Sequence, residues 1–273
     1  MLYSDYKNNF GDILSLEILQ YYYNKAPVEK CQNNAKCDTV FIGSHLELFL
    51  KNKKQKIKRK NQIKTLQIVG SGFIAPENYY EEKEEKLIRK VKVLGVRGKI
   101  TKERLEKNLK KDLSHITLGD PGLLVSNIFD TSKIKKTYKV GIIPHYIDEG
   151  NDLLRNIKIK DTLIIDIKDN TKNVMEKIAS CDFILSSAMH GLIAADSLLI
   201  PNRRIVLSDK VVGGDYKFND YYSVFEKKNP NPIDLKDRVI SQKDVDIFTK
   251  EYHISPEEIK YHQEKIKKML EEL

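Results

Sequence analysis

Hydrophobic residues along the chain fall into two alternating patterns. Short apolar runs rich in valine and isoleucine predict buried β-strands, and longer stretches with apolar residues at helical spacing predict helices between them. The predicted strands lie near residues 39–42, 65–69, 92–96, 115–118, 139–143, 162–166, 183–186 and 204–207. The predicted helices include residues 11–23, 81–90, 102–111, 172–180 and 192–199. Strands that alternate with helices indicate parallel sheets covered by helices on both faces.

A polar segment from Asp130 to Thr137 interrupts this series and separates two similar halves. The chain of 273 residues is long enough for two domains of about 130 residues each. We therefore predict an α/β protein with two doubly wound, Rossmann-like domains that face each other across a cleft. The predicted boundaries are residues 1–132 for the first domain and 133–254 for the second.

The remaining residues, 255–273, predict one more helix. Ser255 and Glu258 have the spacing of a capping box, and Pro256 occupies the first turn. One face then carries Ile259, His262, Ile266, Met269, Leu270 and Leu273 at helical spacing. We expect this face to pack in the core, with the helix crossing back onto the first domain.

Composition favours a folded protein of the cytoplasm. The apolar share of 40% and the charged share of 32% are typical of a globular chain with a core. The first residues lack the apolar region of a secretory signal, and no apolar run approaches the roughly 20 residues that cross a bilayer. Three cysteines cannot form a disulfide framework, and their odd number agrees with a reducing compartment.

The net charge of +9 is compatible with nucleic acid, anionic lipid or phosphorylated small molecules as partners. The densest basic stretch, residues 51–60, has no aromatic residue that could stack on a base, so we expect no nucleic-acid partner. An anionic membrane surface fits this stretch better, and a solvated helix face is the simpler alternative. Histidines and cysteines do not occur at metal-ligand spacing, so no metal site is expected.

Ligands of open α/β sheets bind where the carboxyl ends of strands meet helix N-termini. Gly11 and Asp12 precede the first predicted helix, where Asp12 could accept hydrogen bonds from a sugar or cap the helix. Ser71 and Gly72 follow a predicted strand, and such small residues let backbone N–H groups approach an anion or a sugar. A plain tight turn explains the second pair equally well.

Three further strand ends carry charged or imidazole groups. Arg97 leaves a buried strand and enters a glycine turn before a helix, which places a guanidinium beside helix N–H groups that attract phosphate or carboxylate. His145 ends another strand on the expected cleft side. Asp120 does so too, but an aspartate before a proline is also a common helix N-cap.

The most informative junction is the segment from Ser186 to Gly191. A buried strand runs into two serines, and His190 then lies in the first turn of a helix. A helix N-terminus attracts anions, and a histidine there can exchange a proton with a bound substrate. We therefore predict that His190 is catalytic, with substrate contacts from its neighbours Ser186, Ser187, Met189 and Gly191.

Taken in this order, the segments resemble the polysaccharide pyruvyltransferase family, in particular its exopolysaccharide-synthesis subgroup. The resemblance extends from the Asn-Phe-Gly-Asp segment at residues 9–12 to the Lys-Phe-Asn-Asp-Tyr segment at residues 217–221. It implies a GT-B-like fold and transfer of a pyruvate ketal from phosphoenolpyruvate onto two hydroxyls of a sugar, with release of phosphate. Phosphoenolpyruvate is then the donor substrate, and no cofactor is implied.

The resemblance also implies roles for single residues. Arg97 matches the arginine that holds the anionic groups of the donor, and His190 matches the histidine of an Arg-Leu-His segment. Ala188 stands where that segment has arginine, so its charge is expected from Arg203, Arg204, Lys210 or Lys217. His145, Asp120 and Asp12 are expected to position the sugar. Replacement of Arg97 by alanine should abolish phosphate release and leave the fold intact.

The acceptor implied by the family is a cell-surface glycan precursor such as a lipid-linked oligosaccharide. It would bind on the side of the first domain, at the cytoplasmic face of the inner membrane, where residues 51–60 could touch the lipid surface. Two other functions remain open from the sequence. One is a GT-B glycosyltransferase that uses a nucleotide sugar, and the other is a non-catalytic carbohydrate- or nucleic-acid-binding protein.

Overall fold

The computed structural model describes residues 10–23, 27–29, 37–50, 65–77, 79, 87, 89–228 and 230–273, apart from the side chain of Asp12. The strands are β1 (Thr39–Val40), β2 (Leu66–Val69), β3 (Val91–Val96), β4 (Thr117–Leu118), β5 (Tyr138–Ile143), β6 (Ile157–Lys158), β7 (Thr162–Ile164), β8 (Cys181–Ser186), β9 (Asn202–Val206), β10 (Ile233–Asp234) and β11 (Ile240–Ser241). The α-helices are α1 (Phe10–Tyr22), α2 (Lys99–Leu109), α3 (Thr171–Ala179), α4 (Met189–Ser197), α5 (Tyr216–Tyr222), α6 (Gln242–Glu251) and α7 (Pro256–Glu271). Short 3-10 helices include η3, Pro121–Asn127.

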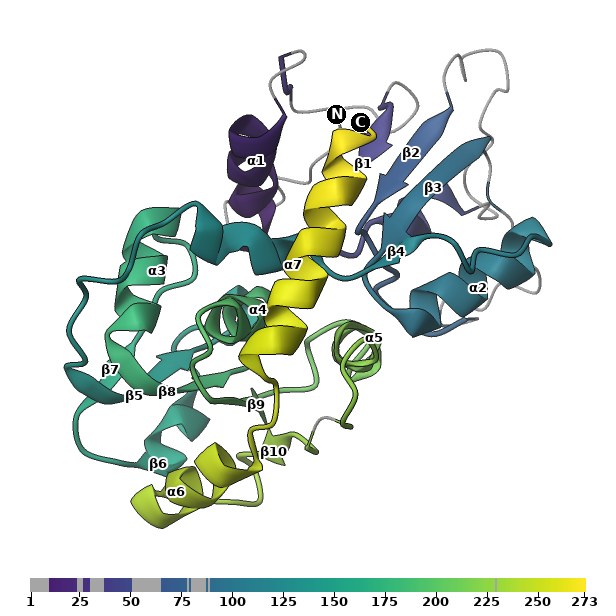
Figure 1. Cartoon of the computed structure of the whole chain (residues 1–273). Coiled ribbons are helices and arrows are strands. Elements are labelled where there is room, and N and C mark those ends of the chain that lie inside the picture. Colours follow the sequence, from purple (N-terminus) through teal and green to yellow (C-terminus); the bar gives the residue numbers. More distant parts are fainter. Residues whose placement is uncertain are drawn as a thin grey trace.

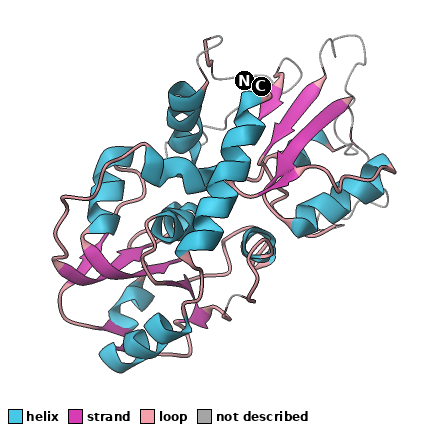
Figure 2. Ribbon diagram, in the orientation of Figure 1, coloured by secondary structure: helices cyan, strands magenta, loops and turns pink. Residues whose placement is uncertain are grey.

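Every ladder between these strands is parallel. One sheet has the order β1-β2-β3-β4, a second has the order β10-β9-β8-β5-β7, and β6 pairs with β11 in a small ladder. Figure 2 shows the strands as two groups with helices between and around them. The predicted α/β class with parallel sheets is therefore confirmed. The predicted helix at residues 81–90 falls almost entirely outside the described residues.

Apolar side chains form a continuous core between the two sheets. This cluster includes Leu14 and Ile18 of α1, Leu123 of η3, Leu192 of α4 and Ile266 of α7. Helix α1 packs against α3 and η3, although the predicted boundary assigned it to the first domain. Because the core runs between the sheets, the division into residues 1–132 and 133–254 stays a prediction.

Helix α7 runs from the second sheet back to the first, as its apolar face predicted (Figure 1). Its capping box is formed, because Ser255 Oγ accepts from the Glu258 N–H and Glu258 Oε2 accepts from the Ser255 N–H. At the far end, the Met269 side chain fills the space above Gly95 of β3, where a Cβ atom would overlap it. The helix thereby closes one side of the first sheet.

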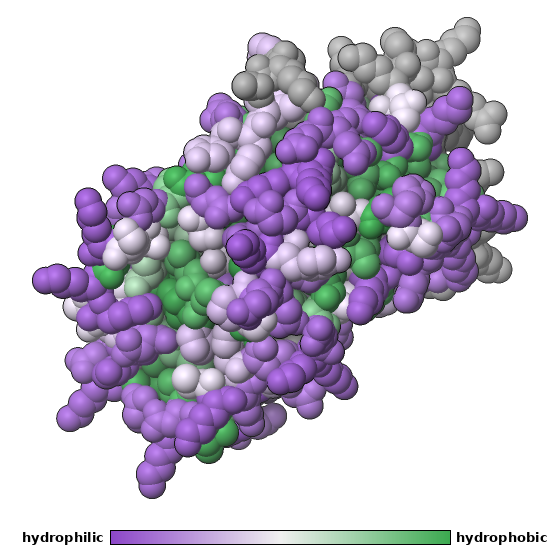
Figure 3. All heavy atoms as spheres, viewed as in Figure 1, coloured by the Kyte–Doolittle hydropathy of each residue, from purple (hydrophilic) through white to green (hydrophobic). Residues whose placement is uncertain are grey.

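The surface seen in Figure 3 is mostly hydrophilic, with apolar residues in small groups between the charged ones. None of the helices in the described part of the chain is long and apolar enough to span a membrane. Cys181 is free and buried, whereas Cys37 is disulfide-bonded, which the expectation of a reducing compartment did not anticipate.

Candidate functional site

The second sheet reverses its strand order between β5 and β8. After β5 the chain continues to β7 on one side, whereas β8 leads through α4 to β9 on the other side. The last paired residues of β5 and β8 are Ile143 and Ser186, so the loops beyond them separate at this point. Such a topological switch point is where open α/β sheets bind ligands. His145 and His190 follow directly beyond these two strand ends.

A cavity of about 340 Å³ opens at this position, and we refer to it as the switch-point cavity. It is lined from the second sheet by the loops after β5 and β8, and from the first sheet by the loop after β1. The sequence predicted five of its lining residues, namely Gly11, His145, Met189, His190 and Lys217. The remaining lining residues are Gly43, Ser44, His45, Ile74, Tyr146, Ile167, Ala188 and Val212.

The described lining of the cavity is electropositive, because among its residues are a buried lysine and no aspartate or glutamate. Burial, with Arg97 and Arg204 nearby, lowers the pKa of Lys217 to about 8. Burial and the Lys217 charge lower the pKa of His145 to about 4 and that of His190 to about 3. Burial and Arg97 lower the pKa of His45 to about 4. At neutral pH the empty cavity thus holds one cationic lysine and three neutral histidines.

His190 is held in the first turn of α4 by close packing against α1. A Cβ atom at Gly11 would overlap its imidazole Nδ1, so glycine is required there for the ring to lie flat on the backbone. The Nε2 atom is buried and has no partner in the described part of the chain. No side chain caps α4, whose N-terminal residues Ala188 and Met189 line the cavity. A ligand can therefore bind both the free imidazole nitrogen and a helix N-terminus.

Lys217 is one of the four residues expected to supply the charge of the arginine that the family places at Ala188. It is 8% exposed, and no carboxylate in the described residues forms an ion pair with it. Arg203 is paired with Glu251, Arg204 lines a neighbouring cavity, and Lys210 is exposed. Of the four residues proposed to supply the missing charge, Lys217 is the one that lines the switch-point cavity.

Arg97 lies behind the cavity and does not fit its expected role as the anion clamp. Its side chain is 0% exposed, and Nε donates to Asp220 Oδ2 over 2.9 Å. The Nη2 atom donates to the Phe73 carbonyl over 2.5 Å, and Nη1 donates to Ser44 Oγ over 2.6 Å. All three guanidinium nitrogens therefore already bind protein groups, and of these groups Ser44 is the one that lines the cavity.

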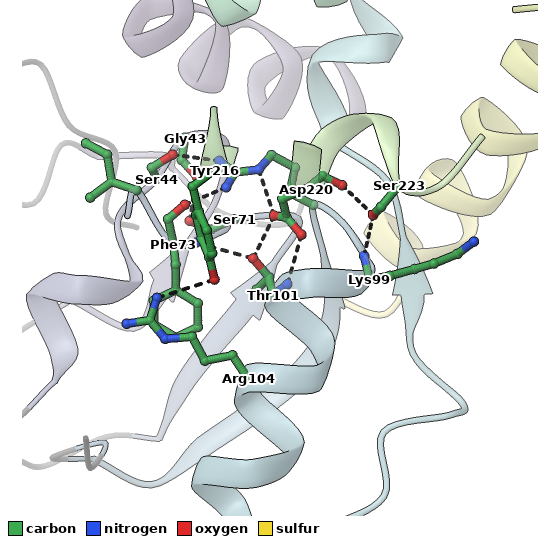
Figure 4. A network of polar contacts seen from close by, with 12 residues as sticks. Gly43, Ser44, Ser71, Phe73, Lys99, Thr101, Arg104, Tyr216, Asp220 and Ser223 are labelled. Atoms are coloured by element: carbon green, nitrogen blue, oxygen red, sulfur yellow. Dashed lines mark hydrogen bonds and ion pairs between the residues drawn. The ribbon is translucent and has the colours of Figure 1, made fainter. Parts of the chain in front are cut away.

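The glycines around Arg97 are explained by this packing. A Cβ atom at Gly72 would overlap the guanidinium, and one at Gly98 would overlap the backbone of Asp220. Asp220 also accepts from the backbone N–H of Thr101 over 2.8 Å and from its hydroxyl over 2.7 Å, so that α5 holds the start of α2 (Figure 4). Removal of Arg97 would leave a buried carboxylate without its partner, so we now expect Arg97→Ala to destabilise the fold.

Several predicted residues support the loops without lining the cavity. Asp120 is completely buried and accepts from the Gly122 N–H over 2.9 Å as the cap of η3, and burial raises its pKa to about 6. The Ser71 hydroxyl donates to the Gly43 carbonyl over 2.9 Å, and the Ser186 hydroxyl lies 2.9 Å from the Ile143 carbonyl. These residues are buried and do not line the cavity, so direct contact between them and a substrate stays a prediction. The side chain of Asp12 lies outside the described residues.

The loop at Gly43, Ser44 and His45 was missed by the sequence analysis. It follows the first predicted strand, so the carboxyl-end rule that found His145 would also have found it. Its polar residues lie one turn beyond Val40 and bring the first sheet into the site.

Comparison with known proteins identifies the family of the chain. Residues 2–209 match the family model described as polysaccharide pyruvyl transferase. An uncharacterised protein of Acanthamoeba polyphaga mimivirus is 33% identical over 212 residues, which are 74% of this chain and 69% of that protein. The succinoglycan biosynthesis protein ExoV of Rhizobium meliloti is 26% identical over 155 residues, which are 56% of this chain and 46% of ExoV.

One solved structure, a functionally uncharacterised protein from Klebsiella pneumoniae, aligns with a TM-score of 0.45 at 14% identity, over 78% of this chain and 83% of that one. The family model matches well over half of the sequence. The matched residues include both the histidine of α4 and the arginine turn after β3. The chain therefore belongs to the polysaccharide pyruvyl transferase family.

Proposed function

We propose that this protein transfers a pyruvate ketal from phosphoenolpyruvate to a sugar of an exopolysaccharide, capsule or other cell-surface glycan precursor, with release of phosphate. The observation that carries the proposal is the lining of the switch-point cavity. Among the residues that the structure describes, it combines Lys217, three histidines and a helix N-terminus with no acidic side chain. A small ligand with both a phosphate and a carboxylate matches such a set of cations and N–H donors.

In the proposed complex, Lys217 is the main counter-charge of the donor. Its ammonium is buried beside neutral imidazoles, where an anion interacts more strongly than it would in water. Ser44 also faces the donor, and its oxygen is held by the Arg97 guanidinium, which orients the hydroxyl proton toward the cavity. The start of α4 adds backbone N–H groups.

The reaction requires two proton movements. A proton is added to the methylene carbon of phosphoenolpyruvate while one sugar hydroxyl, losing its proton, forms a C–O bond to the adjacent carbon. A second hydroxyl then attacks the same carbon and loses its proton, and the C–O bond to phosphate breaks. The net proton count balances, because one hydroxyl proton ends on the new methyl group and the other leaves with phosphate. His190 is neutral when the cavity is empty, and a bound anion beside it would raise its low pKa, so that it can accept a hydroxyl proton in the donor complex.

The acceptor in this proposal is a lipid-linked oligosaccharide at the cytoplasmic membrane face. The basic stretch at residues 51–60, which was expected to contact the membrane, lies outside the described residues. In the described part of the chain, no group of three histidine, cysteine, aspartate or glutamate residues is placed to hold a metal ion.

A phosphate-release assay with phosphoenolpyruvate and a panel of β-galactosides and related glycosides tests the proposal. Phosphoenolpyruvate alone should raise the melting temperature, since a ligand that binds only the folded state stabilises it. Stabilisation by nucleotide sugars instead, with no effect of phosphoenolpyruvate, would identify a glycosyltransferase and overturn the proposal.

His190→Gln tests the proton-transfer role. Glutamine keeps a polar group of similar reach but cannot accept a proton, so turnover should fall by about 100-fold or more while phosphoenolpyruvate still stabilises the protein. His115→Gln, the same change at an exposed histidine, is the matched control and should leave turnover unchanged. Normal turnover of His190→Gln would exclude His190 as the proton acceptor.

A further inference from the structure

A second cavity of about 230 Å³ opens at the carboxyl end of β9, and we refer to it as the β9 cavity. At two places in the sequence, one residue lines this cavity and the next residue lines the switch-point cavity. Ser187 and Val211 line the β9 cavity, whereas the next residues, Ala188 and Val212, line the switch-point cavity. The Ser187 hydroxyl also accepts the His145 N–H over 2.8 Å, so one serine connects the walls of both.

Asp148 fixes the hydroxyl groups of the β9 cavity. This carboxylate is 2% exposed and accepts from the hydroxyls of Ser187, over 3.2 Å, and of Ser208. Because the Ser208 proton is bound to Asp148 and its oxygen accepts the Lys210 N–H over 3.3 Å, one lone pair of this oxygen is left for a ligand that donates. Arg204, which is 6% exposed, lines the same cavity, and its Nε–H is buried without a partner in the described residues. The wall therefore offers an acceptor, and the Arg204 Nε–H behind it is a donor that no described group uses.

The charge of the β9 cavity is opposite to that of its neighbour. Its described lining contains the carboxylates of Asp148, Asp209 and Asp215, and Arg204 forms an ion pair with Asp215 over 2.6 Å. A second polyanion would be repelled here. Neutral hydroxyl groups, each of which donates and accepts one hydrogen bond, match fixed serine oxygens, carboxylates and an arginine N–H.

We propose that the β9 cavity is the acceptor subsite and binds one neutral hexopyranoside ring, with Ser208 and Arg204 as hydrogen-bonding contacts and Asp148 as a positioning residue. The assignment rests on the proposed pyruvyl transfer, which needs a sugar next to the donor. The shared wall at Ser187 and His145 would bring hydroxyls of the ring to the edge of the switch-point cavity. This places the acceptor on the second sheet, and not on the first domain where the sequence placed it.

The test blocks the cavity without touching the donor site. Ser208→Phe fills the space in which the sugar ring would lie, and Ser132→Phe is the same substitution at an exposed serine of the linker. Binding of methyl β-galactoside, β-glucoside, β-mannoside and N-acetyl-β-mannosaminide is measured by saturation-transfer NMR without phosphoenolpyruvate. Binding of phosphoenolpyruvate is measured separately by calorimetry, and it also reports that the variant is folded.

We expect at least one glycoside to bind the wild-type protein and Ser132→Phe, and to bind Ser208→Phe at least tenfold more weakly, with the affinity for phosphoenolpyruvate unchanged. If Ser208→Phe fails to bind phosphoenolpyruvate, we use Ser208→Val instead, because it removes the hydroxyl and adds little volume. We expect Ser208→Val to bind the glycoside about fivefold more weakly than the wild type. Equal glycoside binding by the folded variant, or no binding of any glycoside to the wild type, overturns the inference. If the wild-type protein binds a glycoside but does not bind phosphoenolpyruvate, the proposed function is overturned instead.

Discussion

Two buried cations of this protein lie in contrasting surroundings. Arg97, behind the switch-point cavity, is completely enclosed and donates to Asp220, Ser44 and a backbone carbonyl. Lys217, inside the cavity, is almost as buried but has no carboxylate partner in the described residues. Burial of a charge without a partner costs free energy, which the fold would avoid if the charge had no other use. The lowered pKa of Lys217 reflects that cost.

The contrast shows which property identifies a binding cation. Arg97 stands between glycines at a strand end, the pattern that suggested an anion clamp, yet the glycines only make room for an internal ion pair. Lys217 has no such pattern around it in the sequence. What distinguishes it is the missing counter-charge, which a ligand can supply.

Replacement of Arg97 by methionine should lower the free energy of unfolding by about 3–5 kcal/mol, because Asp220 is left charged and buried without its partner. Urea denaturation measures the change. The double variant Arg97→Met with Asp220→Leu should recover a large part of the loss, since both charges are then gone. A stable Arg97→Met protein that has lost only its affinity for phosphoenolpyruvate would restore Arg97 as the direct clamp.

Lys217→Met should have the reverse profile. Affinity for phosphoenolpyruvate should fall by about 100-fold or more, corresponding to about 2.7 kcal/mol, because the buried counter-charge of the ligand is removed. The free energy of unfolding without ligand should stay the same or rise. Calorimetry and urea denaturation measure the two quantities, and Lys210→Met, at an exposed lysine nearby, is the control. A large loss of stability with unchanged affinity would contradict the assignment.

Much of the fold could be predicted because its signals are local. The apolar runs at β5 and β8 and the capping box of α7 each lie within a few residues of sequence. The strands β6, β10 and β11 were missed because each has two residues and is held by pairing with distant segments. Such strands have no periodicity of their own.

The candidate site was predictable to the extent that it follows strand ends. His145 and His190 were found in this way, because parallel strands bring their carboxyl ends to one edge. The partners of a side chain could not be predicted, since Arg97 and Asp220 are separated by 123 positions and meet only in the folded chain. For the same reason the close contact of Gly11 with His190 looked like an ordinary helix start.

The affinity for phosphoenolpyruvate should depend on pH through Lys217. A bound anion raises the pKa of this lysine above its value of about 8 in the empty cavity, so binding is coupled to proton uptake at higher pH. Affinity attributable to the ammonium should be constant below about pH 7 and reach about half of that value near pH 8. It should then fall by up to about tenfold per pH unit as the empty form loses its proton. Calorimetry across this range should show that decline in the wild type and not in Lys217→Met.

Ser44 links the two regions, and its removal should have the smallest effect. Ser44→Ala takes away one hydrogen-bonding group of the cavity and one partner of Arg97, so affinity for phosphoenolpyruvate should fall by about fivefold, or about 1 kcal/mol. Thr101→Val, which removes a hydroxyl bound to Asp220 on the far side of the same network, should lower stability by a similar amount and leave affinity unchanged. If both variants lose affinity equally, the network acts on the cavity as a unit, and the separation between a structural arginine and a ligand-binding lysine does not hold.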